Sequence, residues 1–183
     1  MVWNDENLIK IIKGGGVVVM PTDTLYGIVG QANNESVVNK IYAIRKRDVN
    51  KPCIILIEDI GNLERLGIFL TENQKSVIEK NNEPTSFILD CPDESLTYLH
   101  RGTNSLAFRV PREQALRDLI TKTGPLIAPS ANIEDFPPAQ TISEAKKYFD
   151  NLVDLYVDGG TLSGKASRII KLQSDGRFST IRE

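Results

Sequence analysis

Hydrophobic and polar positions along the chain alternate between helical and extended spacing. Leu8, Ile11 and Ile12 recur at helical spacing, whereas the valine-rich run at 16–20 ends at a proline, as a buried strand does. The same periodicities predict helices over residues 5–13, 34–45, 71–80, 113–121 and 143–150. They predict strands over residues 16–20, 52–57, 86–90, 105–110, 126–129, 155–158, 168–172 and 178–182.

Interleaved helices and strands predict an α/β fold built on one central sheet. The connections within 86–110 and 168–182 are too short for a helical crossover, so the sheet should mix parallel and antiparallel pairs. We find no internal repeat, low-complexity tract or linker, and 183 residues suit one domain. The expectation is therefore a single domain over residues 1–183.

Composition excludes several classes of protein. Hydrophobic residues make up 40% of the chain and charged residues 25%, which are ordinary globular values. The net charge of -2 argues against binding to nucleic acid by bulk charge. Two distant cysteines and one histidine exclude a zinc ribbon, a disulfide scaffold and most Ser-His catalysis. Cys53 is expected in the core and His100 in a surface loop.

Membrane association and secretion find no support in the sequence. No apolar run approaches the ~20 residues that span a bilayer. The first residues, MVWNDE, lack the basic start and apolar stretch of a secretory signal. A cytoplasmic protein is the expectation.

Polar residues directly follow the first buried strand, in the stretch PTDTLYG at 21–27. Ligands of open α/β sheets gather beyond the carboxyl ends of strands. The Thr22 and Thr24 hydroxyls and the Asp23 carboxylate would there orient a polar substrate or help to hold a metal. The alternative is a polar turn that bonds to its own backbone, and the local pattern alone favours it.

A basic cluster, Arg45-Lys46-Arg47 with Lys51 nearby, follows the second predicted helix. In an extended loop Arg45 and Arg47 would point the same way, and guanidinium groups bind phosphate or carboxylate through two parallel hydrogen bonds. The alternative is a set of cations favoured by the helix dipole at its C-terminus. Spacing alone leaves both interpretations open.

Other polar residues lie on or just beyond predicted strands. Ser130 and Asn132 follow the strand at 126–129, and because His100 is the one histidine available as a base, they are expected to be hydrogen-bonding groups rather than nucleophiles. The alternative is a capping turn, which the local pattern favours. Ser105 and Arg109 are four apart on one strand and so face the same side. Arg109 lies among apolar residues and needs a counter-charge or an edge position.

Taken in order, these segments resemble the YrdC/TsaC family of threonylcarbamoyl-AMP synthases. Residues 21–27 match P-T-[DE]-T-x-Y-G, 45–47 resemble K-x-R, and 130–132 match S-x-N. Residues 108–111 resemble V-R-x-P, and Ser167 follows a D-G-G at 158–160. The resemblance implies a twisted open sheet, parallel and antiparallel, around an electropositive cavity. It also implies that the chain corresponds to the catalytic domain of the family and that the accessory C-terminal domain of longer relatives is absent.

The resemblance further implies an activity. L-Threonine, bicarbonate or CO2, and ATP would give threonylcarbamoyl-AMP and pyrophosphate, and a tRNA-modifying transferase machinery would use the product to make threonylcarbamoyladenosine at position 37. Carried over by position, Arg45 and Arg47 would be catalytic, and Thr24, Arg109, Ser130 and Ser167 would bind threonine. Arg47, Lys51, Ser105, Asn132, Thr141 and Arg182 would bind ATP. Mg²⁺ would arrive with the ATP rather than on protein ligands.

Three positions depart from the family pattern. Arg45 replaces the lysine of K-x-R, Glu83 replaces the glycine of G-P-x-T, and Leu56 replaces a histidine that contacts threonine in some relatives. Two other functions stay open. The first is a non-catalytic module that binds double-stranded RNA, and weak RNA binding is also compatible with an enzyme. The second is transfer of a carbamoyl group from carbamoyl phosphate. The stand-alone length argues against the second.

Overall fold

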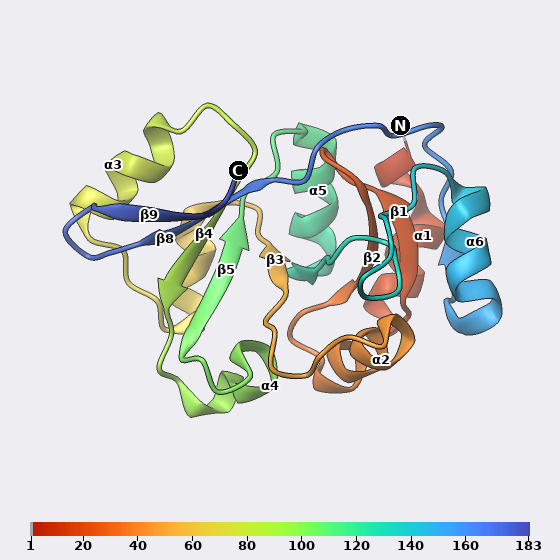
Figure 1. The fold of residues 1–183 in the computed structure, drawn as a ribbon, viewed down its shortest axis with the longest axis horizontal. Coiled ribbons are helices and arrows are strands. Elements are labelled where there is room, and N and C mark those ends of the chain that lie inside the picture. The colour runs from red at the N-terminus through yellow and green to blue at the C-terminus, as the bar shows by residue number, and fades with distance from the viewer. Residues whose placement is uncertain (1) are drawn as a thin grey trace.

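A single nine-stranded sheet organises the computed structural model, which describes residues 2–183 (Figure 1). The strands are β1 (Val18–Pro21), β2 (Tyr26–Gln31), β3 (Ile54–Leu56), β4 (Thr85–Asp90), β5 (Ser105–Arg109), β6 (Leu126–Ile127), β7 (Leu155–Tyr156), β8 (Arg168–Leu172) and β9 (Phe178–Arg182). Their order is β7-β1-β2-β6-β3-β5-β4-β8-β9. The sheet contains parallel pairs such as β3–β5 and antiparallel pairs such as β4–β5, so the predicted mixed, open sheet is confirmed.

Six α-helices and four short 3₁₀ turns connect the strands over the described residues. The helices are α1 (Glu6–Lys13), α2 (Glu35–Arg45), α3 (Glu72–Lys80), α4 (Thr97–His100), α5 (Gln114–Thr123) and α6 (Ile142–Phe149), and the 3₁₀ turns are η1 (Val2–Asn4), η2 (Ile60–Leu66), η3 (Glu94–Leu96) and η4 (Asp150–Leu152). Predicted caps fix the helix starts: Asp5 and Asn34 accept backbone N–H bonds at α1 and α2, and Thr71 forms a capping box with Gln74. No helix within residues 2–183 is long and apolar enough to cross a membrane.

Alternating side chains of the strands feed two separate hydrophobic cores. Val19, Ile55 and Phe108 face the larger core, which α2, α6, η2 and the α3–α4 region cover. Val18 and Leu56 face the smaller core under α1 and α5. The sheet is thus sandwiched between helices over its β1–β2–β6–β3 half.

The smaller core stops before the sheet does. None of its buried residues comes from β4, β5, β8 or β9. The register pairs Leu56 with Arg109, so Arg109, Ala107 and Ser105 point to this same side of the sheet. Among residues 2–183, no helix therefore covers the half of this face beyond β3, which carries polar side chains such as Arg109 and Ser105 beside the apolar Ala107.

Strand β2 was not predicted, because its sequence YGIVGQ contains two glycines and follows the polar motif without an alternating pattern. Gly30 is required where α2 crosses β2: a Cβ there would lie 2.3 Å from Val37 Cγ1. The surface placement of His100 was also wrong. Its side chain is buried, and its Nδ1 accepts the Gly102 N–H at 3.1 Å. Cys53 is buried as expected.

The close crossing of α2 over β2 gives a stability prediction. Gly30→Ala should lower the free energy of unfolding by about 1–3 kcal/mol, because Val37 must move to admit the methyl group. Val37→Ala removes the clashing methyl. The double variant should therefore lose less free energy of unfolding than the sum of the losses in the two single variants. Urea unfolding of all four proteins measures this coupling, and strict additivity would contradict the packing argument.

Candidate active site

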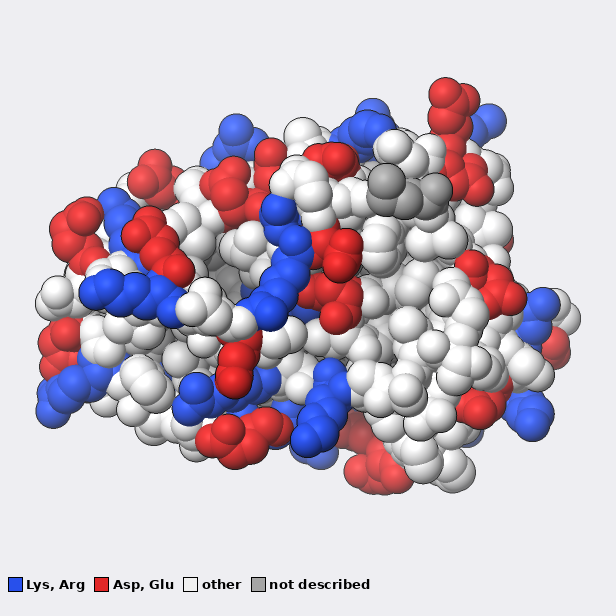
Figure 2. Space-filling model, turned by 90° about the horizontal axis from the view of Figure 1, so that it is seen from above, with Lys and Arg blue, Asp and Glu red and all other residues white. Residues whose placement is uncertain are grey.

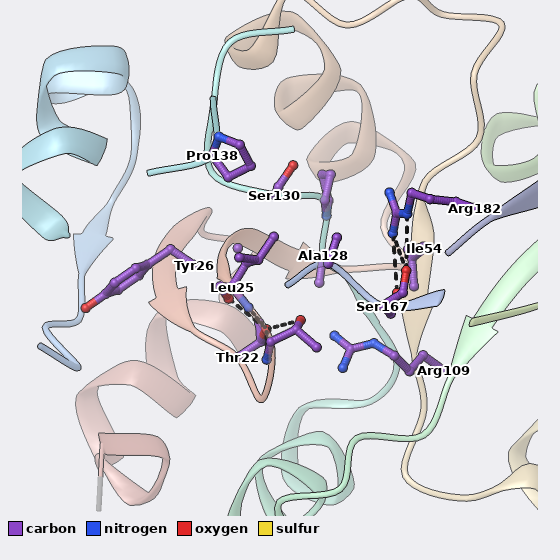
Figure 3. A pocket seen from close by; sticks show the side chains of 14 residues that line it. Thr22, Leu25, Tyr26, Ile54, Arg109, Ala128, Ser130, Pro138, Ser167 and Arg182 are labelled. Atoms are coloured by element: carbon purple, nitrogen blue, oxygen red, sulfur yellow. Dashed lines mark hydrogen bonds between the residues drawn. The ribbon is translucent and has the colours of Figure 1, made fainter. Parts of the chain in front are cut away.

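A pocket of about 140 Å³ opens on the uncovered side of the sheet, next to the end of the smaller core. Its polar lining comes from four parts of the chain: the β1–β2 turn, the end of β5, the segment after β6, and the β8–β9 hairpin with the residues before it. Those residues are Thr22, Thr24, Arg109, Ser130, Ser167 and Arg182. Figure 3 shows Arg182 and Ser167 on one side, Thr22 and Leu25 on the other, and Ser130 and Arg109 at opposite ends. Ile54 and Ala128 form part of the apolar wall.

In the β1–β2 turn, the PTDTLYG motif both bonds to its own backbone and supplies a hydroxyl to the pocket. The Thr22 hydroxyl donates to the Leu25 carbonyl at 2.7 Å and accepts the Thr24 and Leu25 N–H groups at 3.2 Å, so Thr22 does hold its own backbone. The Thr24 hydroxyl lies 3.1 Å from that of Thr22 and lines the pocket. Asp23 does not bond within the turn, because its carboxylate pairs with Arg109 at the end of β5.

Arg109 obtains the counter-charge that its apolar strand requires. Its guanidinium forms an ion pair with Asp23, and both side chains are only 4% exposed. The second carboxylate oxygen of Asp23 accepts the Arg112 N–H at 3.0 Å. One Arg109 nitrogen, Nε, is buried without a protein partner within the described residues. Arg109 therefore lines the pocket as a cation held in place by a carboxylate.

On the wall of the pocket formed by Ser167 and Arg182, a hydroxyl pair holds Ser167 in place. The Ser167 hydroxyl lies 2.9 Å from that of Ser86, which is fully buried on β4. The Ser167 carbonyl accepts two bonds from Arg182, at 3.1 Å from Nε and 2.7 Å from Nη2. Partial burial lowers the pKa of Arg182, and the nearby charge of Arg109 lowers that pKa further. The two guanidinium groups thus face the same small space.

Ser130 joins the pocket to the buried end of α2. Arg45 donates to the Asn132 carbonyl at 2.9 Å and to Asn132 Oδ1 at 3.1 Å, and its Nη2 lies 3.5 Å from Ser130 Oγ. Burial, and then the charge of Arg47, lower the pKa of Arg45. Arg45 Nη1 is buried without a partner in the part of the chain that is described. The amide of Asn132 donates to Ile133 and Phe136 carbonyls, so its side chain is engaged within the turn.

Arg45 and Arg47 do not extend in parallel as the extended-loop interpretation assumed. Arg45 is the last residue of α2, and Lys46 takes a left-handed conformation (φ 51°) that turns the chain. Arg47 donates to the Lys51 and Pro52 carbonyls at 3.0 Å, and Lys51 pairs with Glu134 at 3.0 Å. The Asp48 N–H and then Lys51 lower the pKa of Glu134. These residues form the loop beside Arg45 rather than the pocket lining.

Two further predicted residues lie outside the pocket. Ser105 begins β5 while Arg109 ends it, about 13 Å away at ~3.3 Å per residue, on the same uncovered face. Thr141 caps α6 by accepting the Glu144 N–H at 3.2 Å. Among the predicted residues, the pocket therefore gathers Thr24, Arg109, Ser130, Ser167 and Arg182, and leaves out Arg45, Arg47, Lys51, Ser105, Asn132 and Thr141.

An extended segment, residues 157–167, closes one side of the pocket and crosses the top of the molecule toward β8 in Figure 1. The Tyr26 hydroxyl donates to the Gly160 carbonyl and accepts the Gly159 N–H, both at 2.8 Å. Burial raises the pKa of Tyr26, so the phenol stays protonated. Gly164 packs so closely on the turn that a Cβ would lie 2.4 Å from the Thr24 carbonyl oxygen.

Residues for a protein-bound metal are not grouped anywhere in residues 2–183: no three His, Cys, Asp or Glu side chains converge. The carboxylate beside the pocket, Asp23, already accepts bonds from Arg109 and Arg112. The described side chains thus do not suit Mg²⁺, which prefers several oxygen ligands.

Comparison with known proteins identifies the family. Residues 10–183 match the family model Sua5/YciO/YrdC, whose description is "Telomere recombination". The chain belongs to this family. A Sua5/YciO/YrdC relative from Methanocaldococcus jannaschii, named putative threonylcarbamoyl-AMP synthase, is 34% identical over 97% of this chain and 84% of its own length.

Longer relatives carry the same domain in part of their length. A Bacillus subtilis protein named threonylcarbamoyl-AMP synthase is 31% identical over 90% of this chain and 49% of its own. The crystal structure of P. abyssi Sua5 complexed with L-threonine superposes with a TM-score of 0.87 at 26% identity, over 100% of this chain and 54% of that one. The chain therefore spans about half the length of these two Sua5/YciO/YrdC proteins.

Sequence reasoning missed the supporting residues of the site. Asp23 was seen as a ligand rather than as the partner of Arg109, although the predicted need for a counter-charge pointed to such a carboxylate. Ser86 follows the Pro84-Thr85 pair in the segment resembling G-P-x-T, and that segment was the available signal. Tyr26 was part of the recognised motif without an assigned role.

The Tyr26 hydroxyl gives a local prediction. Tyr26→Phe removes both bonds to the 157–167 segment and should speed amide hydrogen exchange at Gly159 and its neighbours by about tenfold. Hydrogen-exchange mass spectrometry measures this rate. Tyr156→Phe is the control, since that hydroxyl bonds to the Asp150 carbonyl instead. Equal exchange of the segment in both variants would contradict the assigned anchor.

Proposed function

We propose that this protein is a threonylcarbamoyl-AMP synthase that condenses L-threonine, bicarbonate or CO2, and ATP. One observation carries the proposal: the four residues assigned to threonine from sequence, Thr24, Arg109, Ser130 and Ser167, converge on one small pocket from separate parts of the chain. The names of the relatives agree with it. The P. abyssi Sua5 crystal structure, which shares the fold, is a complex with L-threonine.

The pocket suits a small polar amino acid. Its volume of about 140 Å³ suits a small molecule rather than a nucleotide. Arg109 offers a guanidinium for the carboxylate of threonine, and the hydroxyls of Thr24, Ser130 and Ser167 offer hydrogen bonds to its polar groups. Ile54 and Ala128 supply an apolar wall for its methyl group.

ATP is too large for this pocket and would lie beside it. The uncovered face of β5, from Arg109 past Ala107 to Ser105, offers a surface without helices that leads away from the pocket. Arg182 stands at the pocket and donates to Ser167, so it can also reach a phosphate at the boundary of the two substrates. Arg47, Lys51, Asn132 and Thr141 remain the proposed nucleotide-binding residues at the α2 side.

The reaction divides into two steps. The threonine amine attacks CO2, forming an N–C bond and releasing one proton to give a carbamate. A carbamate oxygen then attacks the α-phosphorus of ATP as the bond to the β-phosphate oxygen breaks and pyrophosphate leaves. Both reactants of the second step, the carbamate and ATP, are anions, so the proposed task of Arg45, Arg47, Arg109 and Arg182 is to hold like charges together in preorganised positions.

No protein nucleophile or metal cluster is needed for this chemistry. Mg²⁺ would be held mainly by the ATP phosphates, since the described side chains do not group into a metal site. The product would pass to a tRNA-modifying transferase, which is the proposed partner. The alternative RNA-binding function gains no support from the relatives' names. Acidic and basic side chains intermix over the face in Figure 2 rather than forming one basic surface.

Arg47 provides the first test of catalysis. Arg47→Ala should reduce pyrophosphate release that depends on threonine and bicarbonate by at least about 100-fold, because a cation that stabilises phosphate charge is lost. Enzyme-coupled pyrophosphate detection measures this, and circular dichroism confirms the fold. Arg177→Ala in the exposed β8–β9 hairpin is the control. Wild-type turnover by the Arg47 variant would refute the assigned role.

Ser130 tests the division between the two substrates. Ser130→Ala should weaken threonine binding by about tenfold and change ATP affinity by less than about threefold, since its hydroxyl lines the small pocket. Isothermal titration calorimetry with each substrate separately measures both constants. Equal losses for threonine and ATP would count against a threonine-specific contact.

A further inference from the structure

The strongest unassigned feature of the site is the carboxylate of Asp23. It belongs to the β1–β2 turn, yet its side chain leaves that turn and pairs with Arg109 at the end of β5. Both groups are 4% exposed, so this ion pair is shielded from solvent and salt. An ion pair of this kind is weak evidence for stability, because desolvation offsets much of the attraction. A role in orientation explains its presence better.

Two bonds fix the position of the Asp23 carboxylate. One oxygen accepts from Arg109 Nη1, and the other accepts the Arg112 N–H at 3.0 Å. The carboxylate thereby ties the β1–β2 turn to the start of the β5–α5 connection. With its Nη1 held, the Arg109 guanidinium keeps Nε buried and without a protein partner in the described residues. Because Nη1 is held and Arg109 lines the pocket, an anionic ligand there would meet a guanidinium that is already fixed in place.

Charge balance gives a second reason for the carboxylate. Arg109 and Arg182 line the same pocket, and the charge of Arg109 lowers the pKa of Arg182. Asp23 is the carboxylate that pairs with Arg109, while Arg182 bonds to the Ser167 carbonyl and to no carboxylate among residues 2–183. Without Asp23, two guanidinium groups would repel each other across an empty pocket.

We propose that Asp23 is a positioning residue, which orders the Arg109 guanidinium before the amino acid arrives and so sets the affinity for its carboxylate. Asp23 itself does not touch the substrate. This inference rests on the proposed function, because it takes the ligand of Arg109 to be the carboxylate of threonine. Preordering lowers the cost of immobilising a long side chain on binding.

Asp23→Asn separates positioning from charge. The amide is nearly isosteric and its oxygen still accepts the Arg112 N–H, but it no longer forms an ion pair with Arg109. If Asp23 positions Arg109, threonine affinity should fall by at least about tenfold, and KM should rise more than kcat falls. If Asp23 acted only through its charge, its loss would make the pocket more positive and would strengthen the binding of threonine and of sulfate alike.

The control is Asp154→Asn, which leaves the pocket untouched. Asp154 also accepts one backbone N–H, from Val17 at 2.7 Å, and one cation, Lys40 at 2.9 Å, but it lies just before β7, at the other end of β1 from Asp23. Its variant should bind threonine as the wild type does. Asp23→Glu keeps the charge and should restore most of the affinity. Threonine affinity of Asp23→Asn within twofold of wild type, or a Glu variant as weak as the Asn variant, would overturn the proposal.

A spectroscopic measurement decides the question even if Asp23→Asn fails to fold. In ¹⁵N-arginine spectra of the ligand-free wild type, the Arg109 Nη resonances should be resolved, because the ion pair stops rotation of the guanidinium. Averaged Arg109 resonances in that spectrum would overturn the proposal. If the wild type made no adenylated product from threonine, bicarbonate and ATP, the proposed function would fail, whereas these spectra would still report whether Asp23 orders Arg109.

Discussion

Incomplete coverage of one sheet face is the constraint on which the site depends. Helices α1 and α5 bury the face of β1, β2, β6 and β3, and the smaller core ends there. Strands β5, β4 and β8 continue beyond it with a face that no helix covers, while α2, α6 and η2 contribute to the larger core on the other side. A strand that is packed on one face only can carry Arg109 and Ser86 on the other without burying them in an apolar layer.

Paired polar groups fill this uncovered region and keep it rigid. Asp23 holds Arg109, Ser86 holds Ser167, and Ser167 in turn holds Arg182 through its carbonyl. Each of these bonds joins different strands or loops, whereas Thr22 and Thr24 are held within the β1–β2 turn. Desolvated charges of this kind contribute little to stability, and their arrangement is explained by the anion they are proposed to receive.

The sequence predicted most elements because local signals agreed with the fold. Caps at Asp5, Asn34 and Thr71 marked helix starts, and the apolar runs marked the central strands. Strand β2 was not predicted because its sequence contains two glycines, and the need for one of them, Gly30, comes from a long-range contact with α2 that no local pattern reveals.

Some of the predicted residues line one pocket, but the sequence did not indicate how they are held there. The motif residues Thr24, Arg109, Ser130 and Ser167 do meet, and Arg109 was expected to need a counter-charge. That the partner would be Asp23, 86 positions away, depends on how the β1–β2 turn lies over β5. The separate directions of Arg45 and Arg47 follow from the left-handed conformation of Lys46, which a lysine seldom adopts and which the sequence does not indicate.

The pocket groups are also far apart along the chain: Thr22 comes early, whereas Ser167 and Arg182 come late. A ribosome must therefore synthesise the chain through Ser167 and Arg182 before these groups can assemble, and a nascent chain that stops short of Ser167 lacks one wall of the pocket.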